Sequence, residues 1–508
     1  MTGLFHLGRV KAFVPWVGTI APAVVFILFL SGHTKSAAVD LAHNHALTHR
    51  IRQLGLLFES NDLSLGEMNV YPRGAHFLTS TVGNWFGSSF IGLHLVGLVA
   101  VGIIFSAIAI GLGALPKKLA VHVGVIFVLL LVANHFGPQF ETHGSELVGT
   151  FFFSQLIGFS LLAVSIVVSG RLEARHSDIW AIVSLSVSSV LVATIHLLPA
   201  LIGLGVAWLL AIVSAIGKTR LSSSEKPVAL VTRVALSPLI ASMAILLLPS
   251  TRAMREIAEH DGGLILNHIP YPWGVFTLIA LTGVVSVALS TLWLLRQQVR
   301  ELMVVKYVSA LGLVTAGLGT AQFAALQLGM GSPYAVKKYS YGLTTILFLE
   351  LALLIGLASA RLLNKEAGPK LSSIARGGLS AATVFALFFP IAQAPEVLNV
   401  SNMMKLEEDI ISLGKQTIPP DSLDLTAAVM DIEDLPRSMN YMFSIGLLST
   451  PRSLAEPGIL RAGVPEDLSP YGIVVTSRNG DLAAPQECIL AEQNSLVAVD
   501  IQCSLRTR

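Results

Sequence analysis

The side chains best suited to chemistry lie in one polar segment near the start of the sequence. Residues 33–88 form the longest polar interval between hydrophobic runs before residue 396. The segment contains Asp40, His43, His45, His49, Arg50, Arg52, Glu59, Asp62, Glu67, Tyr71, Arg73 and His76. Because carboxylates, imidazoles and phenols are the usual proton donors and acceptors of enzymes, this segment is the first candidate for a functional site.

Asp40 is the candidate general base. It follows an apolar run that ends near Gly32, in a stretch whose composition is typical of a helix. Residues three and four apart on a helix are neighbours, so His43 and Asn44 would share its face. A carboxylate held on a rigid element at the membrane edge can accept a proton. The alternative is a solvated residue at a helix end.

The YPRGAH element at residues 71–76 predicts a fixed turn. Pro72 restricts its own φ and the conformation of Tyr71, and Gly74 lets the backbone pass close to another group. The stretch that follows ends in Trp85 and Phe86, which is typical of a helix at the membrane interface.

Metal binding is one of three interpretations of the histidines. His45 and His49 have the four-residue spacing of helical zinc ligands, but the sequence gives no third ligand. A divalent ion held by Asp40 and another acid is the second interpretation, and hydrogen bonding or substrate contact is the third. No cofactor is therefore certain. The sequence has no phosphate-binding glycine loop and no GxSxG elbow, which argues against nucleotide hydrolysis.

The elements around this segment are those of a polytopic helical membrane protein. The chain is 53% hydrophobic and 13% charged, with a mean hydropathy of +0.71. About eleven runs are long enough to span a bilayer. They lie near 13–32, 89–115, 119–135, 147–169, 179–196, 198–217, 229–249, 274–295, 303–328, 341–361 and 378–395. The dispersed basic residues and net charge of +2 exclude a nucleic-acid-binding patch.

Lysine and arginine predict the orientation of the chain. They favour the connections on the side of the N-terminus by about two to one, which places the N-terminus inside. We read residues 13–32 as a retained first helix rather than a cleaved signal peptide. The odd number of spans then places the C-terminus and loop 33–88 outside the cytoplasmic membrane.

The sequence divides into a transmembrane domain, 1–395, and an extracytoplasmic region, 396–508. The second part is rich in charge and proline and reads as α+β or β-rich, with a turn at Asn479 and Gly480. It contains the only cysteines, Cys488 and Cys503. We predict that they form a disulfide, and two unpaired buried thiols are the alternative. This region would cap the membrane domain or bind glycan.

The remaining candidate residues lie in the other outward loops. The polar residues of these loops include His135, Glu141, His143, Glu146, His196, Arg252, Asp261, Lys337, Lys338, Tyr339 and Tyr341. Lys337 and Lys338 stand on the side that positive charge usually avoids, directly before a span. An anionic ligand such as a phosphate would explain them, and contact with lipid head groups is the alternative.

This pattern resembles the C-type membrane glycosyltransferases, which use polyprenyl-phosphate sugars. Asp40 matches their acidic residue in the first outward loop. Tyr71, Pro72, Gly74 and His76 match a YPxGxH-like element of their bacterial, actinobacterial-like branch, with Arg73 at a position that usually holds proline or a small residue. His196 with Pro199, and the loop YAVKKYSYG, are also similar. The resemblance covers residues 10 to 395, and no second acid adjoins Asp40.

The resemblance implies transfer of a hexose or pentose from a polyprenyl-phosphate donor to a cell-envelope glycan or lipid-linked acceptor, with inversion. Asp40 would be the base. Substrate contacts would come from His43, Tyr71, Arg73, His76, His196, Arg252, Lys337, Lys338, Tyr339 and Tyr341. The alternatives are a lipid-linked glycan flippase or transporter, which predicts charges within the spans, and an O-antigen-type polymerase or ligase.

Overall fold

The structure is a computed structural model that describes most of the chain. It describes residues 33–34, 39–55, 62–147, 149–221, 227–249, 251, 273–362, 398–418, 426–482 and 484–507. The predicted spans at 13–32 and 378–395, and the candidate residue Arg252, lie outside these residues. The chain forms two compact units. The first comprises Met1–Leu30, Val99–Glu146 and Gln155–Gln393, and the second comprises Ser31–Leu98, Leu147–Ser154 and Ala394–Arg508.

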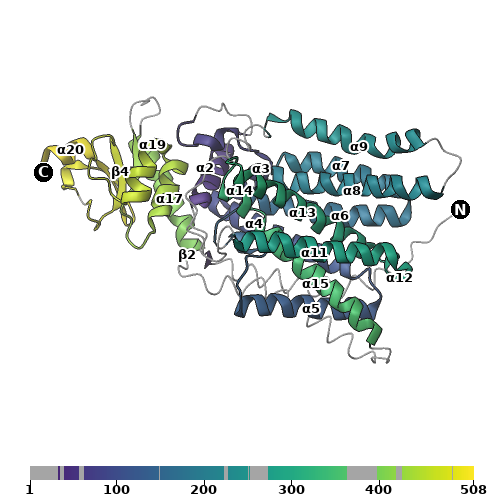
Figure 1. The fold of residues 1–508 in the computed structure, drawn as a ribbon. Coiled ribbons are helices and arrows are strands. Elements are labelled where there is room, and N and C mark those ends of the chain that lie inside the picture. The colour runs from purple at the N-terminus through teal and green to yellow at the C-terminus, as the bar shows by residue number, and fades with distance from the viewer. Residues whose placement is uncertain are drawn as a thin grey trace, which may run out of the picture. The chain divides into compact units, whose positions relative to one another are not determined.

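The first unit consists of long apolar helices (Figure 1). They are α4 (Ser89–Leu112, from Val99 onward), α5 (Lys117–Phe136), α6 (Phe153–Arg175), α7 (Asp178–Ala193), α8 (Leu197–Leu221), α9 (Pro227–Leu247), α11 (Trp273–Leu295), α13 (Met303–Gln327) and α15 (Ser340–Leu362). Two short helices, α12 (Gln297–Arg300) and α14 (Pro333–Lys337), precede α13 and α15.

Among the described residues, seven helical segments are long and apolar enough to cross a membrane. They are Ser89–Leu112, Lys117–Asn134, Phe153–Arg175, Leu197–Ile216, Gly274–Leu295, Met303–Gln327 and Pro333–Ser359. Asp178–Ala193 and Val234–Leu247 are shorter apolar helices. The prediction of a polytopic helical membrane protein is confirmed, and each predicted span from 89 to 361 falls on one of these helices.

Small residues let the helices of the first unit pack closely. In α8 a Cβ added at Gly205 would lie 2.5 Å from a methyl of Val314 in α13, closer than two carbons can approach. The buried core between α7, α8 and α13 includes Ala181, Ala207 and Ala310. Small side chains at such contacts are typical of membrane helices, whose association depends on van der Waals contact.

The second unit contains a four-stranded sheet. Its strands are β3 (Ala427–Val429), β4 (Ile473–Ser477), β5 (Ile489–Gln493) and β6 (Leu496–Asp500), in the order β3-β4-β6-β5. β3 and β4 are parallel and the other pairs are antiparallel. The small β-rich part predicted for the C-terminal region is thus confirmed. The predicted turn follows β4, where the Gly480 N–H donates to the Ser477 carbonyl at 3.0 Å.

The second unit also contains helices from two distant parts of the sequence, the C-terminal region and the predicted first loop. From the C-terminal region come α17 (Val400–Thr417), α18 (Arg437–Leu447), α19 (Arg452–Ala455), the π-helix η3 (Glu456–Ala462), the short η4 (Gln486–Cys488) and α20 (Ile501–Thr507). From the predicted first loop come α2 (Val39–Leu54), η1 (Gly66–Val70) and α3 (Gly74–Phe86). The strand β1 (His33–Thr34) pairs antiparallel with β2 (Leu398–Asn399), and α2 packs against both α18 and α3.

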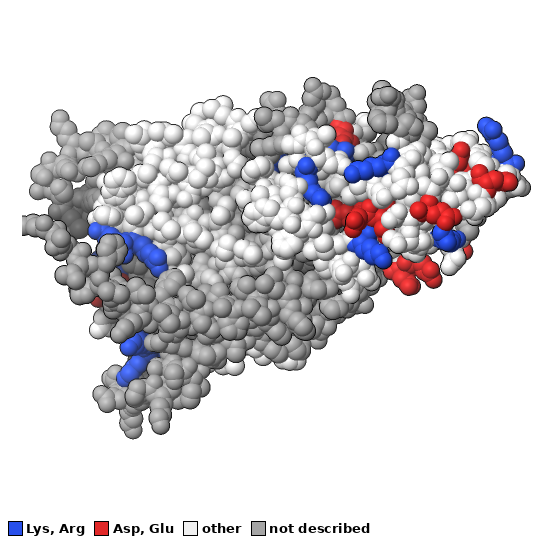
Figure 2. All heavy atoms as spheres, turned by 180° about the vertical axis from the view of Figure 1, so that it is seen from behind, with Lys and Arg blue, Asp and Glu red and all other residues white. Residues whose placement is uncertain are grey.

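Charge is distributed unevenly over the visible surface. In Figure 2 the acidic side chains and many basic ones gather over the part that carries the sheet, whereas the described helices of the first unit are mostly uncharged. An uncharged helical surface is what contact with lipid requires.

The disulfide between Cys488 and Cys503 generates a prediction. The structure contains this bond, with a Cα–Cα distance of 5.5 Å across 15 residues of sequence. In the chain-entropy model a loop of this length contributes about 3 kcal/mol. We expect both thiols to resist alkylation in denatured protein until a reductant is added, and Cys488→Ser with Cys503→Ser to lower the melting temperature. Free alkylation without a reductant would contradict this.

Candidate active site

Helix α2 holds Asp40 in its first turn. Residues 41–49 of this helix are buried, whereas Asp40 itself is partly exposed. Burial against α18 and α3 fixes the helix, and a carboxylate in the first turn interacts favourably with the helix dipole. Asp40 is therefore an accessible acid on a rigid support.

Three other residues of the second unit surround this turn. The Asn44 amide donates to the Asp40 backbone carbonyl at 2.6 Å, and its Oδ1 lies 2.8 Å from His76 Nε2. The Tyr71 and His76 rings make a T-shaped contact, with centroids 5.7 Å apart. Asn44, Tyr71 and His76 are thus brought together around the base of the Asp40 turn.

Burial sets the protonation of these groups. It lowers the pKa of His76 to about 3, so the imidazole is neutral near pH 7 and donates its Nε2–H to Asn44. Burial, reinforced by the nearby Asp40 carboxylate, raises the pKa of Tyr71, while a hydrogen bond with Ser154 opposes the shift. Tyr71 therefore keeps its proton and can donate it in a hydrogen bond.

His43 and Arg73 have other partners. His43 Nε2 lies 3.1 Å from the Tyr441 hydroxyl on α18, and burial, with the charge of Arg452, lowers its pKa to about 3. Arg73 precedes α3 and donates to the Asn69 carbonyl at 3.3 Å. Helical spacing predicts one shared face for Asp40, His43 and Asn44. In the structure His43 contacts Tyr441, whereas Asn44 contacts the Asp40 carbonyl and His76.

The sequence does not reveal the role of Glu407. This acid of α17 is 1% exposed and accepts hydrogen bonds from the Ser88 hydroxyl and, at 3.0 Å, from the backbone N–H of Ser89, the first residue of α4. His45 Nε2 lies 3.5 Å and Arg52 Nη1 3.7 Å from the same carboxylate. The only indication of this role in the sequence is an acidic residue on the apolar face of an amphipathic helix.

The Glu407 carboxylate stays ionised although it is buried. Burial alone would raise its pKa, but interactions with His45, Ser88 and His49 lower the pKa to about 2. Because this lies below the ordinary value of 4.5, its contribution to stability is full above pH 4.5 and is lost as the pH falls toward 2. Ionised Glu407 also complements the helix dipole at the N-terminus of α4.

The zinc interpretation finds no geometric support. His49 Nδ1 lies 3.2 Å from the Ser89 hydroxyl, and burial lowers the His49 pKa to about 3. Within the residues that the structure describes, no group of three or more His, Cys, Asp or Glu could hold a metal ion.

The first unit holds the lysine pair. Lys337 is buried with its Nζ 3.5 Å from Glu141 Oε1. Lys338 Nζ lies 4.2 Å from the centroid of the Tyr334 ring, and its carbonyl accepts from the Gln155 amide at 2.7 Å. The charge of Lys337 is therefore balanced by an acid, and Lys338 also contacts an aromatic face.

The other predicted residues of this unit are buried near the lysines. Tyr339 is 7% exposed and Tyr341 fully buried, both where α14 passes into α15. Burial, with the charge of nearby Lys338, lowers the pKa of His196, whose Nδ1 accepts from the Leu198 N–H at 3.2 Å. Lys338 and His196 are thus electrostatic neighbours.

No protein-family model and no curated protein matches the chain. Its fold is similar to that of the apo oligosaccharyltransferase of Archaeoglobus fulgidus, at 11% identity and a TM-score of 0.39, over 90% of this chain and 69% of that one. It is also similar to ArnT from Cupriavidus metallidurans bound to undecaprenyl phosphate, at 14% identity and a TM-score of 0.38, over 97% and 98%. At these TM-scores neither likeness assigns the chain to a family.

The contacts of Glu407 generate a matched pair of variants. Glu407→Gln removes the charge that Ser88, Ser89 and Arg52 share, and hydrogen bonds to charged groups contribute about 1.5–3 kcal/mol. We expect a clear fall in the melting temperature of the purified protein. Glu408→Gln, at the exposed neighbouring position, should leave it unchanged. Equal melting of the two variants would show that the network is not stabilising.

Proposed function

We propose that this protein transfers a sugar from a polyprenyl-phosphate donor to a cell-envelope glycan or lipid-linked acceptor, at the outer face of the cytoplasmic membrane. The position of Asp40 carries the proposal. It is a partly exposed carboxylate on a buried, rigid helix, in a chain whose described residues include seven helices able to cross a membrane. The proposal includes an N-terminus inside and a C-terminus outside, as the lysine and arginine bias favours.

The chemistry assigned to Asp40 is general-base catalysis. Its carboxylate takes the proton of an acceptor hydroxyl while that oxygen attacks the anomeric carbon of the donor sugar. The bond between that carbon and the phosphate oxygen breaks, polyprenyl phosphate leaves with the electron pair, and the configuration at the carbon inverts. The protonated Tyr71 phenol is suited to donate a hydrogen bond to the carboxylate or a sugar oxygen.

The leaving phosphate needs positive charge, which we assign to the lysine pair. Cations near a developing phosphate charge stabilise the transition state. We assign the phosphate to Lys337 and Lys338 together, with His196 as an electrostatic neighbour of Lys338. A hexosyl and a pentosyl donor fit this assignment equally.

A second function, transport of a lipid-linked glycan, is favoured by one observation. Glu350 lies within the membrane-spanning part of α15 and is fully buried. It accepts a hydrogen bond from Ser286 of α11 at 2.6 Å, and a Cβ at Gly312 of α13 would collide with it. An acid inside a span is often part of an ion or proton pathway.

Asp40→Asn tests the transferase directly. The amide keeps the size of the carboxylate but cannot accept a proton, and general-base assistance contributes about 10²–10⁴-fold in rate. We expect turnover with a purified polyprenyl-phosphate sugar to fall by that amount, with little change in donor binding. Asp481→Asn, at an exposed position, is the control. Normal turnover of the Asp40 variant would remove the base assignment and make Glu141 and Asp261, which lies outside the described residues, the next candidates.

The lysine assignment predicts a different kinetic change. Lys338→Ala should weaken donor binding roughly tenfold, because the donor phosphate is charged before as well as during the reaction. Titration of the donor would measure this, with exposed Lys118→Ala as the control. Lys337→Ala should in addition lower the melting temperature, since Glu141 loses its ion pair with Lys337. Unchanged donor affinity in Lys338→Ala would refute the assignment.

Glu350→Gln separates the two functions. If the protein is a transferase, the variant should retain its turnover, since Glu350 takes no part in the chemistry. If it transports a lipid-linked sugar with the help of this acid, the variant should lose exchange of a labelled lipid-linked sugar across proteoliposomes. Exposed Glu301→Gln is the control. Wild-type protein that exchanges the labelled lipid but transfers no sugar would favour transport.

A further inference from the structure

A polar cavity opens on the second unit, away from the residues assigned to the base. Its volume is about 480 Å³, within the roughly 300–1,000 Å³ common for small-molecule sites. Its walls come from two distant parts of the sequence, Gly66 and Glu67 of η1 and five residues of α19 and η3.

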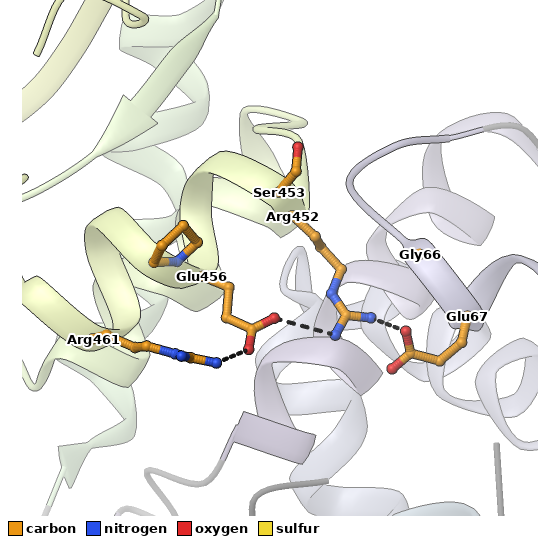
Figure 3. Close-up of a pocket in the computed structure, with 7 residues that line it drawn as sticks. Gly66, Glu67, Arg452, Ser453, Glu456 and Arg461 are labelled. Carbon is orange, nitrogen blue, oxygen red and sulfur yellow. Dashed lines mark hydrogen bonds and ion pairs between the residues drawn. The ribbon is translucent and has the colours of Figure 1, made fainter. Parts of the chain in front are cut away.

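The charged side chains of the cavity alternate in sign. Figure 3 shows Glu67, Arg452, Glu456 and Arg461 in a row, each joined to the next. Arg452 pairs with Glu67, and its Nη2 lies 4.0 Å from Glu456 Oε2. Arg461 lies 3.1 Å from Glu456 Oε1. The charges of the two guanidinium groups and the two carboxylates cancel, so these four side chains give the cavity no net charge that would select an ion.

The row nevertheless has unused hydrogen-bonding capacity. A guanidinium has five N–H donors and a carboxylate about four acceptor positions, more than these contacts occupy. A ligand hydroxyl both donates and accepts, so adjacent hydroxyls can bridge neighbouring members of the row. We propose that this cavity binds an uncharged saccharide.

The cavity is held in shape by contacts behind its wall. Gly66 has φ +52°, and a Cβ there would lie 2.7 Å from an Arg452 guanidinium nitrogen, so this close approach needs glycine. The Arg452 backbone N–H donates to the Leu63 carbonyl at 3.1 Å. With 17% of its side chain exposed, Arg452 is fixed, whereas Arg461, at 75%, is accessible to a ligand.

A chain of contacts connects the cavity with helix α2. Arg452 hydrogen bonds the Tyr441 phenol, and Tyr441 lies 3.1 Å from His43, three residues after Asp40. On the proposed transferase function, on which this identification rests, the saccharide is the acceptor glycan. Its binding to the cavity needs neither the donor nor turnover.

The experiment measures saccharide binding to the full-length protein in nanodiscs, without donor. The probes are mannotriose, maltotriose, galactotriose and arabinotriose, with trigalacturonate as the anionic comparison. We expect at least one neutral trisaccharide to bind better than trigalacturonate. Arg461→Ala and Glu456→Gln should each weaken that binding on the order of tenfold, since each removes hydrogen bonds to a charged group.

Arg478→Ala is the matched control, because Arg478 forms an exposed pair with Glu492 on the same unit. It should bind as the wild type does. Absence of saccharide binding by the wild type, preference for trigalacturonate, or unchanged binding in both cavity variants would each overturn the proposal. Arg461 is mostly exposed, so its variant tests the site without disturbing the fold. Saccharide binding by a protein without transferase activity would support the cavity and refute only the acceptor role.

Discussion

The second unit depends on one buried carboxylate. The Glu407 carboxylate accepts hydrogen bonds from the Ser88 hydroxyl and from the Ser89 N–H at the start of α4. It also lies beside His45 and Arg52 of α2. A buried anion is tolerated only where donors surround it, so these elements cannot separate without leaving a charge unsatisfied. The rigidity of the helix that carries Asp40 follows from this constraint.

Burial gives the same helix a second property. His43, His45 and His49 lie along α2 and are all buried, and burial lowers the pKa of His43 and His49 to about 3. Near pH 7 the rings of His43 and His49 are therefore neutral hydrogen-bonding groups of the core. The partly exposed carboxylate at the start of the helix is thus followed by two neutral imidazoles on the buried turns.

Local patterns in the sequence predicted much of this structure. Apolar runs of spanning length predicted the long helices, because such runs need no distant partner to be recognised. Composition predicted the helix that contains Asp40, and turn residues at Asn479 and Gly480 marked the short strands of the C-terminal region. The two cysteines lie only 15 residues apart, so their pairing was also within reach of the sequence.

What the sequence could not predict depends on contacts between distant residues. Glu407 and Ser89 are 318 positions apart, and Arg452 and Glu67 are 385 apart. No periodicity connects such positions, so the grouping of α2 and α3 with the C-terminal sheet was not predicted. His43 shows the same limit within one helix, since Tyr441 rather than helical spacing determines its contact.

The pairing of β1 with β2 has a consequence for biosynthesis. Thr34 faces Leu398, so all the described membrane helices lie, in sequence, inside a loop that these two short strands close. At about 5–20 residues per second, tens of seconds separate the synthesis of α2 from that of its Glu407 partner. Until then the α2 residues that contact Glu407 lack this partner, so α2 reaches its final packing only after the membrane helices have been made.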